Sequence, residues 1–115
     1  METKAEFHKT ICNYYTEISK GKVPKEMLDD VASRIADYYY DQYTSFSIKY
    51  PKSIKRYSHY QIKDLEHPDT FEIIIAYFKE LLGNDYRSYS LVLLQMTEDE
   101  LTDFEKNREG FYNMF

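Results

Sequence analysis

The chain contains very little cysteine, glycine and proline, and it contains no tryptophan. Its 115 residues include one Cys, three Gly and three Pro. A single cysteine excludes a framework of internal disulfides. So few glycines and prolines leave little material for the many tight turns of an all-β fold. No apolar run approaches the roughly 18 residues that a membrane-spanning helix needs, so no membrane association is expected.

Length and overall composition indicate one folded domain. A chain of 115 residues suffices for one domain but not for two, and it buries roughly two-thirds of the surface that its unfolded form exposes. Apolar residues make up 43% and charged residues 30%, which argues against disorder. Residues 1–6 have no apolar core of the kind found in secretion signals. The sequence therefore predicts a small, soluble, cytoplasmic protein with a single domain over residues 1–115, in which residues 110–115 are a candidate flexible tail.

Apolar residues recur at helical spacing along most of the chain, and no repeat or low-complexity tract interrupts them. The spacing predicts helices over residues 3–19, from 24 to about 43 or 46, over 69–82 and from 97 onward. A weaker pattern covers residues 51–65, where a partly ordered loop is the alternative. Residues 86–96 fit a buried helix or a buried strand. We favour a helix there because no second strand is available to pair with it.

Residues at the ends of these segments are typical of helix caps. Glycine stops are expected at Gly21, Gly83 and Gly110. Capping boxes are expected at residues 69–72 and 97–100. The fold class that follows is all-α, with five or six helices in an irregular or orthogonal bundle. The predicted core consists of the apolar residues on the inner faces of these segments: Phe7, Ile11, Ile18, Leu28, Val31, Ile35, Phe71, Ile74, Ile75, Phe78, Leu81, Leu82, Val92, Leu93 and Leu101.

Charge is distributed unevenly along the chain, whose net charge is −5. Residues 44–63 contain five Lys or Arg and no Asp or Glu, so this basic segment carries +5. Residues 1–43 carry −2, and residues 64–115 carry −8. Two interpretations fit this distribution. Either folding mixes the charges on one surface, or the basic segment forms a local patch that meets phosphate groups or an acidic partner.

The residue types that catalysis and metal binding require occur without the necessary patterns. His8 and Cys12 lie one turn apart on the first predicted helix, but no third His or Cys lies near them in sequence. His59 and His67 flank carboxylates at no regular spacing. A Gly-rich phosphate loop and the Gly-x-Ser-x-Gly, His-Glu-x-x-His and Cys-x-x-Cys motifs are all missing. We therefore predict no enzymatic activity, no catalytic residues, no cofactor and no metal site.

Tyrosine is the residue type that the chain has in excess, with 13 Tyr. Each buried hydroxyl needs a partner, so several of these side chains should be at least half-exposed, and Tyr is enriched in protein interfaces. The triplet 38–40 spans about 200° of a helix, so at least one of its rings should lie at the rim. The alternative is that Tyr is simply a generic surface residue here. The predicted binding surface combines tyrosines with bases of the basic segment: Tyr38, Tyr40, Tyr43, Lys52, Lys55, Arg56, Tyr57 and Tyr60.

Two functions fit this predicted surface. The first is a non-enzymatic protein-binding module, such as an inhibitor or an immunity protein that occupies the surface of a partner. The alternative is a nucleic-acid-binding helical domain in which residues 49–63 contact phosphates and bases. A sequence pI near 5.2 is unusual for an autonomous nucleic-acid-binding domain, which favours the first function. The predicted partner is therefore another protein, with nucleic acid as the alternative.

Overall fold

The computed structural model describes the backbone of residues 3–49, 65 and 67–113, and the side chains of residues 3–40, 65 and 67–107. Within these ranges the fold is all-α, as predicted, and contains no strand. Its elements are α1 (Lys4–Ser19), α2 (Lys25–Lys49), α3 (Pro68–Leu82), the 3-10 helix η3 (Gly83–Asp85), α4 (Tyr86–Leu94) and α5 (Glu98–Asn113). The weak helix expected over residues 51–65 lies outside the described residues except for Leu65, so the expected number of helices for the whole chain stays a prediction.

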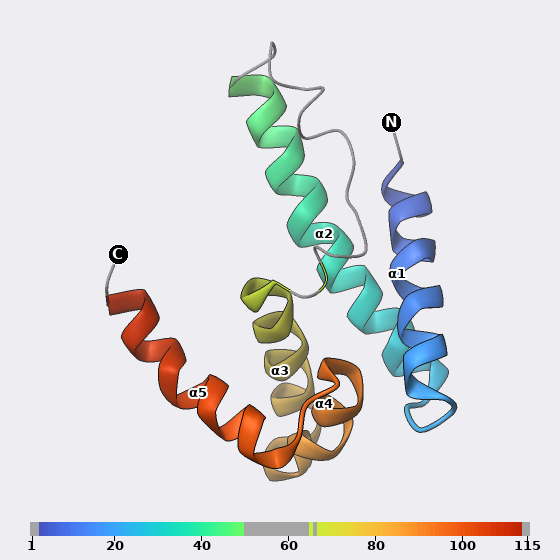
Figure 1. Cartoon of the computed structure of the whole chain (residues 1–115). Helices are drawn as coiled ribbons and strands as arrows, with labels where there is room; N and C mark the ends of the chain where they lie inside the picture. Colours follow the sequence, from blue (N-terminus) through green and yellow to red (C-terminus); the bar gives the residue numbers. More distant parts are fainter. Residues whose placement is uncertain (1–2, 50–64, 66, 114–115) are drawn as a thin grey trace.

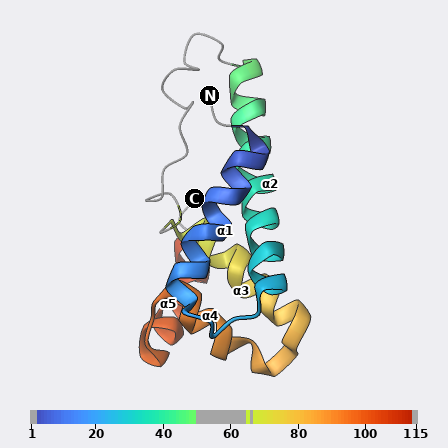
Figure 2. The ribbon, with the colours of Figure 1, turned by 90° about the vertical axis from the view of Figure 1, so that its right-hand side faces the viewer.

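The helices α1 and α2 form an antiparallel hairpin, and α3, α4 and α5 gather at one end of it (Figure 1, Figure 2). α3 packs against α2 and α4, and α4 also contacts α1. α2 has 25 residues and α1 has 16, so the C-terminal turns of α2 project beyond α1. α5 diverges from α3 toward the C-terminus (Figure 1).

Local capping signals determine several of the helix ends. Thr3 Oγ1 accepts a hydrogen bond from the Glu6 N–H at 3.1 Å, and Glu6 Oε2 accepts one from the Thr3 N–H at 3.4 Å. The expected capping box of Thr97 and Glu100 begins α5, with distances of 3.2 and 3.1 Å. Gly83 ends α3 with a φ of 60°, as expected. Residues 86–94 form a helix rather than a strand, which confirms the favoured alternative.

Two of the predicted caps are wrong, because a neighbouring residue takes the capping role. The left-handed cap of α1 is Lys20, with a φ of 48°, and Gly21 follows it with a φ of 81°. The N-cap of α3 is His67, whose Nδ1 accepts a hydrogen bond from the Asp69 N–H at 3.1 Å. Pro68 occupies the first position of α3, which proline favours, so the cap must precede it.

Two helices are longer than predicted. α2 continues to Lys49 instead of ending near residue 43 or 46. α5 continues through Gly110 to Asn113, so Gly110 does not stop it. Glycine lowers helix propensity by about 1 kcal/mol relative to alanine, which weakens a helix without ending it. A glycine stop also needs a left-handed conformation, and the helical assignment of residues 110–113 excludes that here.

The core lies where the inner faces of α1, α2, α3 and α4 meet. Most of the predicted core is buried, namely Phe7, Ile11, Leu28, Val31, Ile35, Ile74, Ile75, Phe78, Leu93 and Leu101. Four more predicted residues are half-buried around them: Ile18, Phe71, Leu82 and Val92. The prediction is wrong for Leu81, which is 49% exposed. Leu81 lies in the last turn of α3, where no described helix covers its side chain.

The core also contains two tyrosines that the sequence analysis did not place there. Tyr15 is 1% exposed and Tyr77 is 5% exposed. On α1 the buried row is Phe7, Ile11, Tyr15 and Ser19, each one turn after the last. Tyr14, the residue before Tyr15, is half-buried beside this row.

Removal of the Phe78 ring should be the most informative test of this core. Phe78 is fully buried, and its ring packs against Tyr77 and Tyr89 at centroid distances of 5.1 and 5.7 Å. Phe78→Ala should lower the free energy of unfolding by roughly 3–5 kcal/mol, measured by urea denaturation. Leu81→Ala on the same helix is the control and should cost less than about 1 kcal/mol. Equal costs for the two variants would contradict this packing.

Candidate functional site

The structure describes the α2 part of the predicted binding surface. Tyr38 and Tyr40 are both half-buried near the middle of α2. Tyr43 belongs to the α2 backbone, but its side chain lies outside the described part. The remaining predicted residues, Lys52, Lys55, Arg56, Tyr57 and Tyr60, lie outside the described residues altogether. The proximity of the tyrosines to the bases therefore stays a prediction.

Tyr40 is the member of the tyrosine triplet that is left available on the surface. The Lys4 Nζ atom lies 5.9 Å from the centroid of the Tyr40 ring and 2.6 Å from Asp37 Oδ1. Among the described residues, none forms a hydrogen bond with the Tyr40 hydroxyl. An exposed cation over an aromatic ring contributes about 0.5–1 kcal/mol. The Tyr40 ring is therefore half-exposed, and its hydroxyl has no hydrogen-bond partner among the described residues.

The other two members of the triplet turn toward α3. The Tyr38 hydroxyl donates to Asp69 Oδ2 at 2.9 Å. The Tyr39 hydroxyl shares a hydrogen bond with Thr70 Oγ1. The two rings meet edge to face, with centroids 5.0 Å apart. Tyr38 therefore connects α2 to α3, and its hydroxyl already has a partner within the protein.

A third tyrosine bond joins the same two helices in the opposite direction. The Tyr77 hydroxyl on α3 donates to Asp30 Oδ2 on α2 at 2.9 Å. The Arg34 guanidinium lies 4.9 Å from the Tyr77 ring centroid and bonds to Glu80 Oε2 at 3.0 Å. Burial, followed by the hydrogen bond to Asp30 and its negative charge, raises the pKa of Tyr77 to about 12. The phenol therefore stays protonated well above neutral pH.

Arg87 on α4 is the centre of a polar network that holds α5. Its Nε donates to Glu98 Oε2 at 2.7 Å, and its Nη1 donates to Glu105 Oε1 at 3.1 Å. Its Nη2 donates to the Glu98 carbonyl and to Thr102 Oγ1, both at 3.0 Å. The Tyr86 hydroxyl donates to the same Glu105 carboxylate at 2.7 Å. The hydrogen bond to Glu98 is the largest cause that raises the pKa of Arg87, so the guanidinium stays charged.

The side chains that could ligate a metal ion lie apart from one another in the part of the chain that the structure describes. Within this part, no group of three or more His, Cys, Asp and Glu is placed to hold a metal ion. His8 Nε2 faces Asp29, at 3.2 Å from Oδ1, and makes no hydrogen bond with Cys12. A helix of the length and apolar character needed to cross a membrane is likewise not found among these residues.

Comparison with known protein families, with curated proteins and with solved structures finds no match to this chain. Function is therefore inferred from the side chains and their contacts. Sequence reasoning missed the roles of Tyr77 and Arg87. A signal for Tyr77 was present, because it follows Ile74 by three residues on the apolar stripe of α3. No local pattern identifies Arg87, because its partners lie 11–18 residues away.

The Arg87 network predicts how α5 is attached. Arg87→Met keeps most of the side-chain volume but removes the hydrogen bonds that the Arg87 guanidinium makes to α5. Loss of hydrogen bonds to charged groups should lower the free energy of unfolding by about 1–3 kcal/mol. Amide hydrogen exchange should speed up over residues 98–107 and stay unchanged in α1. Arg34→Met, which removes a more exposed pair, is the control and should leave exchange in α5 unaltered. Unchanged protection of α5 in Arg87→Met would show that other contacts hold it.

The raised pKa of Tyr77 predicts an alkaline loss of stability. The folded protein holds this proton more tightly than the unfolded chain, in which tyrosine titrates near pH 10. Its contribution is therefore complete below about pH 10 and is lost as the pH rises toward about 12. Urea denaturation at several pH values should show a steeper alkaline decline for wild type than for Tyr77→Phe. Parallel declines in the two proteins would contradict the assignment.

Proposed function

We propose that this protein is a non-enzymatic binding module that acts by occupying the surface of a partner protein in the cytoplasm, in the manner of an inhibitor or an immunity protein. The observation that carries the proposal is the position of Tyr40. Its ring is half-exposed on α2, and no described residue forms a hydrogen bond with its hydroxyl. Tyrosine buries a large area at little entropic cost, which makes such a ring a suitable anchor in an interface.

Charge supports an acidic partner surface. α2 leads directly into the segment 44–63, which carries +5 and contains no acid. Lys4 adds a cation beside the Tyr40 ring. An aromatic anchor with a cation beside it suits a partner whose surface is rich in carboxylates, because complementary charges speed encounter and exclude wrong partners.

The same basic segment also favours a second candidate, which is binding to nucleic acid. Its five cations could neutralise phosphates, and its tyrosines could stack on bases. The two candidates differ in salt dependence. Phosphate contacts release counterions, so a nucleic-acid complex should weaken steeply between low and physiological salt. A protein interface anchored by a tyrosine should weaken much less.

The proposal is tested by affinity capture from cells of the source organism, with identification of bound molecules by mass spectrometry, followed by titration of the purified partner. Tyr40→Ala should cost roughly 1–3 kcal/mol of binding free energy. The double variant Lys55→Glu with Arg56→Glu should weaken binding while the melting temperature stays nearly unchanged.

A matched charge reversal at the α1–α2 turn provides the control. Lys22 and Lys25 are exposed and distant in sequence from the basic segment. Lys22→Glu with Lys25→Glu should bind the partner like wild type. Normal binding by both the Tyr40 and the Lys55/Arg56 variants would place the interface elsewhere on the protein. Loss of the complex with rising salt, together with nuclease sensitivity, would favour the nucleic-acid candidate.

A further inference from the structure

α5 is attached to the rest of the described structure by a few side chains instead of by close packing of helices. Among the described elements, none packs along the length of α5, which diverges from α3 (Figure 1). Leu101 is its one buried residue in the part whose side chains are described, and the Phe104 and Phe71 rings meet with centroids 5.8 Å apart. A helix with so little buried apolar surface opens at lower free energy than the core.

The polar contacts of α5 converge on three residues of α3 and α4. Arg87 donates to Glu98 Oε2 at 2.7 Å and to Glu105 Oε1 at 3.1 Å. The Tyr86 hydroxyl donates to Glu105 Oε1 at 2.7 Å, and Lys79 Nζ lies 3.5 Å from Glu105 Oε2. Contacts between charged donors and carboxylates are directional, so they select two carboxylates at the spacing of Glu98 and Glu105. The α5 of a second copy of the chain presents the same spacing.

The link between α4 and α5 contains a residue in an unfavourable backbone conformation. Gln95 caps α4 with a φ of 55° and a ψ of 44°, in the left-handed region that glycine tolerates and other residues rarely adopt. Lys20 is the other non-glycine residue with a positive φ in the described part of the chain. Continuation of α4 through residues 95–97 would return Gln95 to the right-handed region.

The sequence of this link is compatible with a continuous helix as well as with a turn. Residues 84–109 contain neither Gly nor Pro, and Gln95 and Met96 are of types with high helix propensity. The capping box of Thr97 and Glu100 has the opposite effect, because it begins α5 as a separate helix. The left-handed residue and the capping box have effects of similar magnitude, so the bent and the straight forms of the link lie close in free energy.

We propose that two copies of this chain bind each other by exchanging α5, so that Glu98 and Glu105 of each copy bond to Arg87 of the other. The exchanged dimer reproduces the described contacts of α5 and releases Gln95 from its left-handed conformation in both chains. Exchange of an identical element makes a dimer without requiring a new surface. Association costs translational and rotational entropy, so the dimer forms at high protein concentration. It uses α3, α4 and α5 and is therefore separate from the proposed protein-binding surface.

Refolding at two protein concentrations tests whether the natural sequence exchanges α5. The chain is unfolded in urea and refolded at about 10 µM and at about 1 mM, because exchange between two chains depends on their concentration. Size-exclusion chromatography with light scattering then gives the mass. We expect a monomer at the lower concentration and a dimer fraction at the higher one. A monomer under both conditions overturns the proposal.

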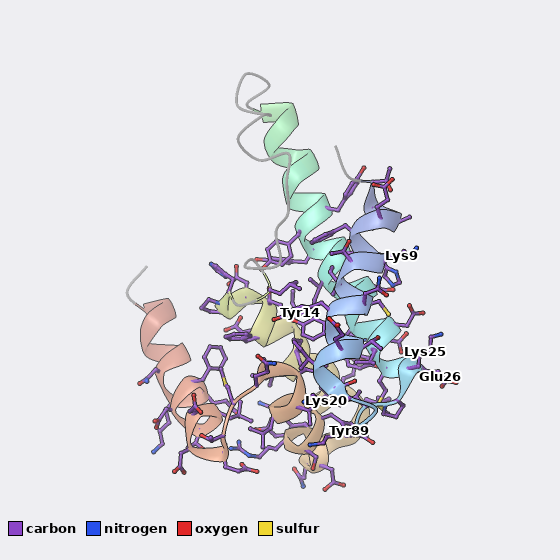
Figure 3. The ribbon with its side chains drawn as sticks, turned by 45° about the vertical axis from the view of Figure 1, so that its right-hand side comes forward. Lys9, Tyr14, Lys20, Lys25, Glu26 and Tyr89 are labelled. Carbon is purple, nitrogen blue, oxygen red and sulfur yellow. The ribbon has the colours of Figure 1, made fainter. Side chains whose placement is uncertain are left out.

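Glycine substitutions at the two left-handed residues test the role of the link. Gln95→Gly relieves the bent link and weakens a continuous helix, so it should raise the Kd of the dimer by about 10-fold or more. Lys20→Gly is the matched control, because Lys20 ends α1 with a φ of 48° and lies in a turn that is not exchanged (Figure 3). It should leave the Kd within about 2-fold of wild type. Equal Kd values for the two variants overturn the proposal.

Reciprocal charge reversal tests which copy supplies α5. One variant carries Lys79→Glu with Arg87→Glu, and the other carries Glu98→Lys with Glu105→Lys. Each variant alone opposes like charges, whereas a mixed dimer with exchanged α5 pairs opposite charges at both sites. Native mass spectrometry of the two chains refolded together should therefore show the mixed dimer in at least about 10-fold excess over either dimer of identical chains.

A mixed dimer that is no more abundant than random pairing gives would show that the chains associate through another surface, and this overturns the proposal. The glycine variants keep every described contact of α5. They therefore decide the outcome even if a charge-reversed variant folds poorly.

Discussion

Hydrogen bonds from tyrosine hydroxyls to side chains on neighbouring helices decide how the helices of this protein are placed. Tyr38 on α2 bonds to Asp69 on α3, and Tyr77 on α3 bonds back to Asp30 on α2. Apolar contacts between the same helices have little directionality, so they constrain the crossing angle less tightly than hydrogen bonds do. One of the two bonds has its donor on α2 and the other has its donor on α3, and they join residues 31 and 47 positions apart in sequence. Together they hold one register and one crossing angle between the two helices.

A tyrosine hydrogen bond also joins α4 to α5, where fewer apolar side chains are buried. Leu101 is the one described residue of α5 that is buried. Besides Leu101 and the contact of the Phe104 ring with Phe71, α5 is attached through the Tyr86 hydroxyl and the Arg87 guanidinium, which both bond to Glu105. Elements with few buried apolar contacts open at lower free energy than a packed core. The α1–α2 hairpin and α3 are thus the more stable part of the fold, and α5 should open at lower free energy.

This use of tyrosine changes what the composition says about function. An excess of Tyr suggests a binding surface, but four of the eight described tyrosine side chains form hydrogen bonds between helices through their hydroxyls. Three others, Tyr15, Tyr40 and Tyr89, form no hydroxyl hydrogen bond with a described residue. Tyr40 is half-buried on α2 beside Lys4, whereas Tyr15 lies in the core. The counts of residue types cannot separate these roles.

The sequence by itself determined the all-α class, most helix positions, the Thr97–Glu100 box and the stop at Gly83, because periodicity and capping involve residues within about four positions of each other. It also required at least one ring of the triplet 38–40 to lie at the rim of α2. The tertiary structure alone decided that Tyr15 and not Tyr14 enters the core, and that Leu81 stays outside. It also decided that Tyr38 is committed to Asp69. Each of these outcomes depends on which helix lies opposite, and the residues on that helix are tens of positions away in the chain.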